Sequence, residues 1–344
     1  MPLYSQPIRA QETPFAPTES TTEVNIYIGV IDIPHIDEPG ETYDLDAYLT
    51  LVWEDPAAYD YIKEKMGIPE GTTYMSLSKD GAHEQIEDSG WLNIIQFTNQ
   101  VGDRHILNAS LRILPTGEVT YDERFQATLS SKFYLKSYPF DSQKLHIEIE
   151  TFNLDINDVL FAASQETITF YKSPKYVDAD FELEEWFINP QIDVYVGEYT
   201  SNMTGRTYSY VSIDILANRK TGFHIWKIFL PLILILAVSW SVFWIARENV
   251  SSRLSISSIG FLSAISFNFF VSSSLPKISY LTFMDRFIAG VFLFMALTVI
   301  VVLIMHFATE RGKLGIVSRM NQQARWIFPA IFGIYMLVTT LALS

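Results

Sequence analysis

The chain has 344 residues, no cysteine and a net charge of −15 at pH 7. The missing cysteines exclude disulfides and thiolate chemistry, and the negative charge argues against nucleic acid as a partner. Nine basic and three acidic residues lie after residue 221, which leaves 15 basic and 36 acidic residues before it. An acidic first part of charge −21 therefore precedes a basic second part, and we expect two domains, 23–221 and 222–344.

The first part has the pattern of a β-sandwich. Residues 1–22 are polar and are expected to form a flexible leader. From Glu23 onward, short runs that alternate apolar and polar residues, such as 48–53, 106–113 and 144–150, are separated by turn residues. Many short strands at this spacing predict an immunoglobulin-like antiparallel β-sandwich.

The second part has four apolar segments that predict a transmembrane four-helix bundle, with helices at about 223–246, 252–275, 283–307 and 323–343. Each is long enough, or nearly so, for a hydrocarbon core of about 30 Å. Basic residues are concentrated between the first and second segments and between the third and fourth. The positive-inside rule places both links in the cytoplasm, with the β-sandwich and the C-terminus outside.

The second segment carries more serines than a lipid-facing helix needs. Helical steps of three and four place seven residues on one face: Ser251, Ser255, Ile259, Leu262, Ser266, Phe269 and Ser273. We interpret this face as the lining of a pore, in which Leu262 and Ile259 form a constriction that closes by dewetting. The alternative is a buried bundle helix whose serines bond to their own backbone carbonyls.

Several motifs occur in an order that resembles one family. Residues 138–141 read Tyr-Pro-Phe-Asp, residues 48–56 end in Trp-Glu-Asp-Pro, and Arg219 precedes the first apolar segment. With the four segments, these motifs make residues 24–344 similar to the pentameric ligand-gated ion channels, or Cys-loop receptors. Ser131 and Leu145 stand where animal members have the two disulfide-bonded cysteines. This departure and the short link between segments three and four point to a bacterial member in the inner membrane.

The resemblance implies a homopentamer in the lipid bilayer, opened by a small-molecule agonist and conducting monovalent cations, with no enzymatic activity, no cofactor and no metal. A small organic cation suits aromatic rings and a carboxylate, and protons are an alternative agonist. The implied ligand residues are Trp91, Glu150, Phe152, Tyr199 and Tyr208, with Arg124 and Arg112 from a neighbouring subunit. Tyr195 is an alternative to Tyr199.

The resemblance also implies a junction that couples the two domains, formed by Tyr138, Pro139, Phe140, Asp141, Arg219 and Pro276. An ion pair between Asp141 and Arg219 would hold this junction together. Glu248, close to the cytoplasmic end of the pore helix, is the expected selectivity residue.

Two other functions fit parts of the sequence. One is a membrane-anchored binding or adhesion sandwich without a pore, which would not need a serine-rich second segment. The other is a glycosidase using Glu148 and Glu150, which we discount because we expect those two carboxylates to face opposite sides of a strand. The six histidines show no metal-ligand spacing.

Overall fold

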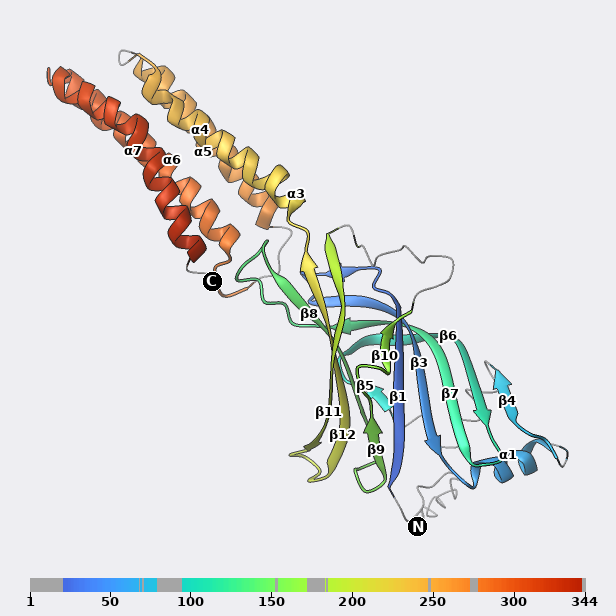
Figure 1. Ribbon diagram of the computed structural model, residues 1–344. Coiled ribbons are helices and arrows are strands. Elements are labelled where there is room, and N and C mark those ends of the chain that lie inside the picture. Colours follow the sequence, from blue (N-terminus) through green and yellow to red (C-terminus); the bar gives the residue numbers. More distant parts are fainter. Residues whose placement is uncertain are drawn as a thin grey trace, which may run out of the picture.

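The computed structural model of the chain describes residues 21–67, 69, 71–78, 95–151, 154–171, 183, 185–246, 249–272 and 278–341. A β-sandwich lies at one end of an elongated molecule and a bundle of long helices at the other (Figure 1). This arrangement confirms the expected fold class. The expected leader lies almost entirely outside the described residues, because the description begins at Thr21.

The larger sheet of the sandwich has the strand order β10-β1-β3-β7-β6-β4, with β2 paired to β3 and β9 paired to β1. Its strands are β1 (Thr22–Asp32), β2 (Ile36–Asp37), β3 (Thr42–Glu54), β4 (Met75–Ser78), β6 (Gln100–Ile113), β7 (Glu118–Ser130), β9 (Val159–Ala162) and β10 (Ile168–Phe170). The pairs of β1 with β9 and with β10 are parallel, and the remaining pairs are antiparallel. A short helix, α1 (Ala58–Met66), follows β3.

The smaller sheet has the order β11-β12-β8-β5 and is antiparallel. Its strands are β5 (Ile95–Phe97), β8 (Ser142–Thr151), β11 (Trp186–Thr200) and β12 (Thr207–Arg219). Strand β8 shows why the sheet forms, because Leu145, Ile147 and Ile149 are buried while the residues between them face outward. Burying each such side chain contributes about 1.5–3 kcal/mol. The outward residues of β8 are therefore available for other roles.

Four helices in the described residues are long and apolar enough to cross a membrane. The first begins with α3 (Gly222–His224), widens into a π-helical turn η2 (Ile225–Phe229), continues as α4 (Leu230–Trp240) and ends in a 3₁₀ turn η3 (Ser241–Trp244). The others are α5 (Val250–Ser272), α6 (Phe283–Glu310) and α7 (Leu314–Leu341). Helix α7 begins at Leu314, well before the start expected near residue 323.

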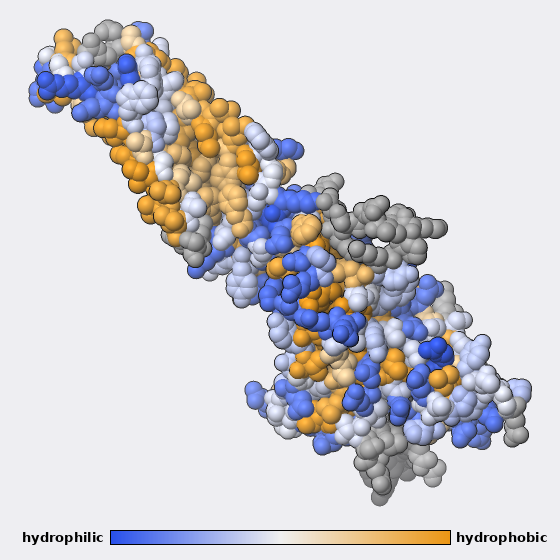
Figure 2. Space-filling view, in the orientation of Figure 1, coloured by the Kyte–Doolittle hydropathy of each residue, from blue (hydrophilic) through white to orange (hydrophobic). Residues whose placement is uncertain are grey.

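Helix α7 is attached to α6 through a close contact. A Cβ atom added at Gly290 would lie 2.4 Å from Cε1 of Tyr335, so only glycine leaves room for that ring. The Tyr335 hydroxyl donates a hydrogen bond to the carbonyl of Arg286, at 2.8 Å. Most of the apolar surface of α7 stays uncovered within one subunit, as the wide apolar band of Figure 2 illustrates.

Candidate functional site

A carboxylate and three tyrosines lie together on the outer face of the smaller sheet. Strand register places Glu150 opposite Tyr210, and Tyr199 opposite Tyr208. The Tyr199 ring lies 5.7 Å from the Tyr208 ring and 6.3 Å from the Tyr210 ring, measured between centroids. The amide of Gln96 donates a hydrogen bond to Glu150. Burial and a hydrogen bond to Glu150 raise the pKa of Tyr199 to about 12, which keeps its phenol neutral.

Glu150, Tyr199 and Tyr210 border a cavity of about 750 Å³. Four of the cavity's side chains are acidic and three are tyrosines: Glu148, Glu150, Glu198, Asp214, Tyr195, Tyr199 and Tyr210. Aromatic faces attract cations, and carboxylates supply the opposite charge. The cavity is therefore suited to a small positively charged molecule. Tyr195 and Tyr199, which the sequence left as alternatives, both border it.

The structure corrects the expectation for Glu148 and Glu150. Both point to the outer face of β8, because residues two apart on a strand share a face. They border the same cavity. The sequence argument against a glycosidase, which relied on opposite faces, was therefore wrong.

Two of the remaining ligand candidates are not described by the structure, and a third, Tyr208, does not border the cavity. Trp91 and Phe152 lie outside the described residues. Tyr208 is buried beside Tyr199, its register partner on the neighbouring strand, and does not border the cavity. Its hydroxyl lies 3.3 Å from the Thr204 hydroxyl, at the tip of the β11–β12 hairpin. Tyr208 therefore packs against the Tyr199 ring without lining the cavity.

Arg124 lies on the larger sheet, where it forms two hydrogen bonds of 2.9–3.0 Å with Asp46. Burial would raise the pKa of Asp46, but hydrogen bonds from Arg124 and Gln126 outweigh burial and lower it. Arg112 lies one strand away, with Nη2 3.5 Å from the Thr120 hydroxyl. Opposite Arg124 in the register is Tyr48, whose ring packs edge-on against Tyr171 at 5.2 Å. Sequence reasoning missed this partly exposed aromatic pair.

A hydrogen bond joins the two ends of the loop between β7 and β8. The hydroxyl of Ser131 donates to the carbonyl of Lys144 at 2.6 Å, beside the buried Leu145. This hydrogen bond lies where the sequence comparison expected a disulfide in animal relatives. The loop is therefore closed without covalent chemistry.

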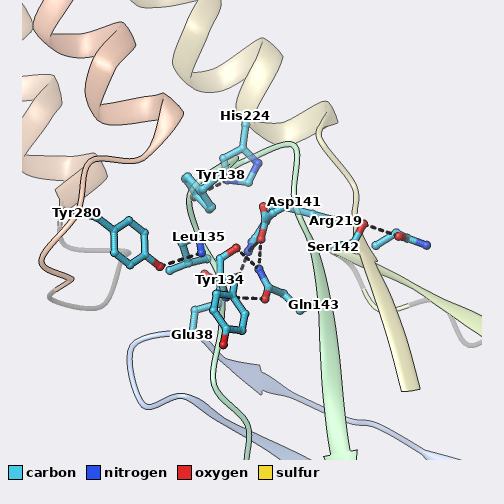
Figure 3. Close-up of polar contacts among 11 residues, drawn as sticks. Glu38, Tyr134, Leu135, Tyr138, Asp141, Ser142, Gln143, Arg219, His224 and Tyr280 are labelled. Atoms are coloured by element: carbon cyan, nitrogen blue, oxygen red, sulfur yellow. Dashed lines mark hydrogen bonds and ion pairs between the residues drawn. The ribbon is translucent and has the colours of Figure 1, made fainter. Parts of the chain in front are cut away.

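Arg219, at the end of β12, is the centre of the junction between the two domains (Figure 3). Its Nε and Nη2 donate to the two carboxylate oxygens of Asp141 at 2.8 and 3.1 Å, and its Nη1 donates to Glu38. The guanidinium also lies 4.6 Å from the ring centroid of Tyr138 and 4.1 Å from that of Trp186. The expected Asp141–Arg219 ion pair is present, and Glu38 and Trp186 are additions that the sequence did not reveal.

The same loop contacts the first and third membrane helices. The Tyr138 hydroxyl lies 2.6 Å from Nε2 of His224 in α3. Phe140 packs against Phe229 of η2 and Phe283 of α6, with ring centroids 6.0 and 5.5 Å apart. The backbone of α6 joins the loop where the Phe283 N–H donates to the carbonyl of Lys136 and the Met284 N–H to that of Tyr138. A movement of the sandwich would therefore be transmitted to the first and third membrane helices through this one loop. Pro276 lies outside the described residues.

Helix α5 presents the predicted pore face to the outside of the subunit. Six of the seven residues are exposed: Ser251, Ser255, Ile259, Leu262, Ser266 and Phe269. The exposed fractions of Ile259, Leu262 and Phe269 are 65%, 64% and 72%. The opposite face, which includes Arg253, Gly260 and Ala264, is buried against neighbouring helices. Ser273 and Glu248 lie outside the described residues.

The alternative, in which serines of this helix bond to its own backbone carbonyls, is also observed in part. The hydroxyl of Ser266 donates to the carbonyl of Leu262 at 3.1 Å, and that of Ser263 to Ile259 at 2.9 Å. Ser266 is nevertheless exposed, so its oxygen can still accept from water. Among the described residues, the face is polar at Ser251, Ser255 and Ser266 and apolar at Ile259, Leu262 and Phe269.

Comparisons with known proteins cover both domains. Residues 4–221 match the neurotransmitter-gated ion-channel ligand binding domain, and residues 228–337 match the neurotransmitter-gated ion-channel transmembrane region. A proton-gated ion channel from Gloeobacter violaceus is 26% identical over 332 residues, which are 96% of this chain and 85% of that protein. A gamma-aminobutyric acid receptor subunit beta-like protein from Drosophila melanogaster is 27% identical over 283 residues, or 79% of this chain and 53% of that protein. A gamma-aminobutyric acid receptor subunit beta-4 from Gallus gallus is 25% identical over 288 residues.

Proposed function

We propose, since this chain belongs to the family of pentameric neurotransmitter-gated ion channels, that it forms a homopentameric, cation-selective channel opened by a small organic cation. Members of this family are channels and not enzymes. The chain crosses the membrane four times after a large extracellular ligand-binding domain. The family assignment favours a channel over the adhesion alternative.

The observation that carries the ligand proposal is the group formed by Glu150, Tyr199 and Tyr210. A primary ammonium in the cavity would meet the carboxylate of Glu150 and the faces of two tyrosine rings. The nearby acids Glu148, Glu198 and Asp214 add negative potential that attracts the same class of ligand. The Tyr48–Tyr171 pair and Arg124, on the other sheet, are candidates for the face that a neighbouring subunit contributes.

The test is a set of concentration–response curves for primary amines, recorded under voltage clamp. Glu150→Gln should raise the half-maximal concentration about tenfold, because a desolvated cation–carboxylate or cation–aromatic contact contributes roughly 1–2 kcal/mol. Tyr199→Ala should act similarly, whereas Tyr199→Phe keeps the ring and should act less. Glu166→Gln, at an exposed turn, is the matched control. Equal responses in all four variants would contradict the site.

Proton gating is the second candidate. A relative that spans nearly the whole chain is a proton-gated channel, and the junction contains a carboxylic acid, Glu38, whose pKa is raised by burial. Acidification without any amine separates the two candidates. A current that develops on lowering the external pH, with no response to amines at pH 7, would favour protons.

A further inference from the structure

Arg253, in the first turn of α5, is a buried arginine inside a membrane-spanning helix. Its side chain is long enough to reach water from the end of such a helix, yet the residue is only 2% exposed. Ionisable side chains inside a membrane segment are costly, and they commonly mark a functional position. Neither the predicted pore face nor the ligand cavity includes Arg253, so its burial requires a separate explanation.

The guanidinium of Arg253 is directed to the end of the first membrane helix. The last carbonyls of a helix have no partner within that helix, and basic side chains often bond to them. Nη2 of Arg253 donates to the carbonyl of Ile245, the residue that follows the 3₁₀ turn η3. The negative end of the helix dipole also favours a cation at this position. Arg253 therefore caps a helix other than its own.

The same guanidinium contacts the third membrane helix. Its Nη1 lies 3.9 Å from the sulfur of Met305 in α6. Met305 is buried in an apolar cluster together with Val242, Phe243 and Val302. One side chain of α5 thus contacts the first and the third membrane helices at their cytoplasmic ends.

Helix geometry connects these contacts to the predicted pore face. Ser251 and Ser255, the two residues of that face nearest the cytoplasm, are exposed, whereas Arg253 between them is buried. Residues two apart on a helix are separated by about 200° around its axis, so Arg253 points away from the pore when both serines point into it. The bonds that hold Arg253 to the neighbouring helices therefore keep the two serines away from the pore axis.

We propose that Arg253 is a positioning residue for ion conduction. It holds the cytoplasmic end of α5 against the first and third membrane helices and keeps the rings of Ser251 and Ser255 side chains wide enough for ions. This role rests on the proposed function, in which α5 lines the pore of an ion channel. It is independent of the agonist, and the position of the guanidinium matters more than its charge.

The test is single-channel recording of the full chain in planar bilayers, with sodium and then dimethylammonium as the permeant cation. The channel is opened by whichever stimulus activates the parent, a primary amine or acidification. Arg253→Gln has a shorter side chain and loses the bond to the Ile245 carbonyl, so the end of α5 moves toward the axis. We expect a lower sodium conductance and a larger loss of dimethylammonium permeability, because a narrower constriction discriminates against the larger ion.

Arg253→Lys separates position from charge. Lysine keeps the positive charge but lacks the planar fork of arginine, so it cannot bond to the Ile245 carbonyl and contact the Met305 sulfur together. We expect its sodium conductance to lie between those of the parent and of Arg253→Gln. Met305→Leu, a replacement of similar volume, removes only the sulfur contact and should give a smaller loss than Arg253→Gln.

Arg325→Gln is the matched control. Nε of Arg325 donates to the carbonyl of Phe243 at 3.0 Å, at the same end of the first membrane helix, but Arg325 belongs to α7. Nδ2 of Asn321 bonds to the same carbonyl at 2.7 Å and remains in this variant. Arg325→Gln thus removes an arginine cap without changing α5, and its conductance should equal that of the parent.

Three results would overturn the role of Arg253. The first is a conductance of Arg253→Gln equal to that of the parent, and the second is an equal loss in Arg253→Gln and Arg325→Gln. The third is a raised sodium conductance in Arg253→Gln with a normal one in Arg253→Lys, which would mean that the charge repels cations and the position is immaterial. A parent protein that passes no current would contradict the proposed function itself, and this role with it.

Discussion

At the scale of single residues, Arg219 combines several roles. It closes the end of β12, pairs with two carboxylates and lies against two aromatic rings. Burial alone would lower its pKa, but the hydrogen bonds and charges of Asp141 and Glu38 outweigh burial and raise it. Burial raises the pKa of Glu38, because the loss of hydration outweighs the attraction of the Arg219 guanidinium.

Asp141→Asn should therefore weaken both folding and coupling. Breaking a buried ion pair on one side costs about 3–5 kcal/mol, and the remaining bond to Glu38 places the effect toward the lower value. We expect a lower unfolding temperature and a reduced maximal current at saturating agonist. Asp60→Asn, on the exposed face of α1, is the control and should leave both unchanged. A normal current in a destabilised Asp141→Asn protein would separate stability from coupling and contradict the second expectation.

Glu38 gives a pH prediction. Burial raises its folded-state pKa above the usual 4.5, so the folded protein binds a proton more readily than the unfolded chain. The stability from this group is complete below the unfolded pKa and is lost as the pH rises through the folded pKa. Glu38→Gln should flatten the part of the pH dependence just above 4.5. Unfolding temperatures of parent and variant across pH 4–7 provide the measurement, and identical slopes would contradict the prediction.

The partners of these residues could not be found from the sequence alone. Glu38 and Arg219 are separated by 181 positions, and no periodicity links a residue near β2 to the end of β12. The Asp141–Arg219 pair was found because the family resemblance names both positions. Tyr210 was missed for a different reason: the resemblance pointed to Tyr208, and the sequence does not say which of two tyrosines on the same strand face borders the cavity.

At the scale of elements, regular hydrophobic patterns were predicted well and interruptions were not. Alternation identified strands such as β8, and long apolar segments identified the membrane helices. The start of α7 was placed too late, because Leu314–Arg325 is polar enough to leave the membrane but remains helical. The π-helical turn Ile225–Phe229 lies just before Pro231, which has no backbone N–H to donate to the carbonyl of residue 227. Neither this turn nor the 3₁₀ end at Trp244 was predicted.

Helix α5 carries the gating prediction. Replacing Leu262 by threonine should wet the closed constriction and favour the conducting state. Loss of roughly 1–2 kcal/mol of apolar contact corresponds to about a tenfold lower half-maximal agonist concentration, with increased leak current. Ile256→Thr removes similar apolar surface from a half-buried face of the same helix and is the control. Unchanged leak current and agonist sensitivity in Leu262→Thr would contradict a role for Leu262 in the gate.

At the scale of the whole molecule, charge is divided between the domains. Residues 1–221 carry −21, so five subunits around an axis would give a strongly negative entrance that enriches cations. We expect reversal potentials in asymmetric NaCl to follow the sodium gradient. Glu248→Gln should shift them toward zero, while Glu310→Gln, exposed at the end of α6, should not. A reversal at the chloride potential in the parent protein would contradict cation selectivity.

The contact between Gly290 and Tyr335 has a consequence for biogenesis. Helix α7 is the last of the four membrane helices in the chain, so it is synthesised after the surface at Gly290 against which it packs. The Tyr335 ring packs against Gly290 while its hydroxyl donates to the Arg286 carbonyl, and the two contacts together constrain the rotation and the depth of α7. One aromatic side chain thus favours a single packing orientation of the last membrane helix. Even Gly290→Ala would place a methyl group against the Tyr335 ring and oppose this packing. Adding Tyr335→Ala would remove the clash but not restore the hydrogen bond to the Arg286 carbonyl.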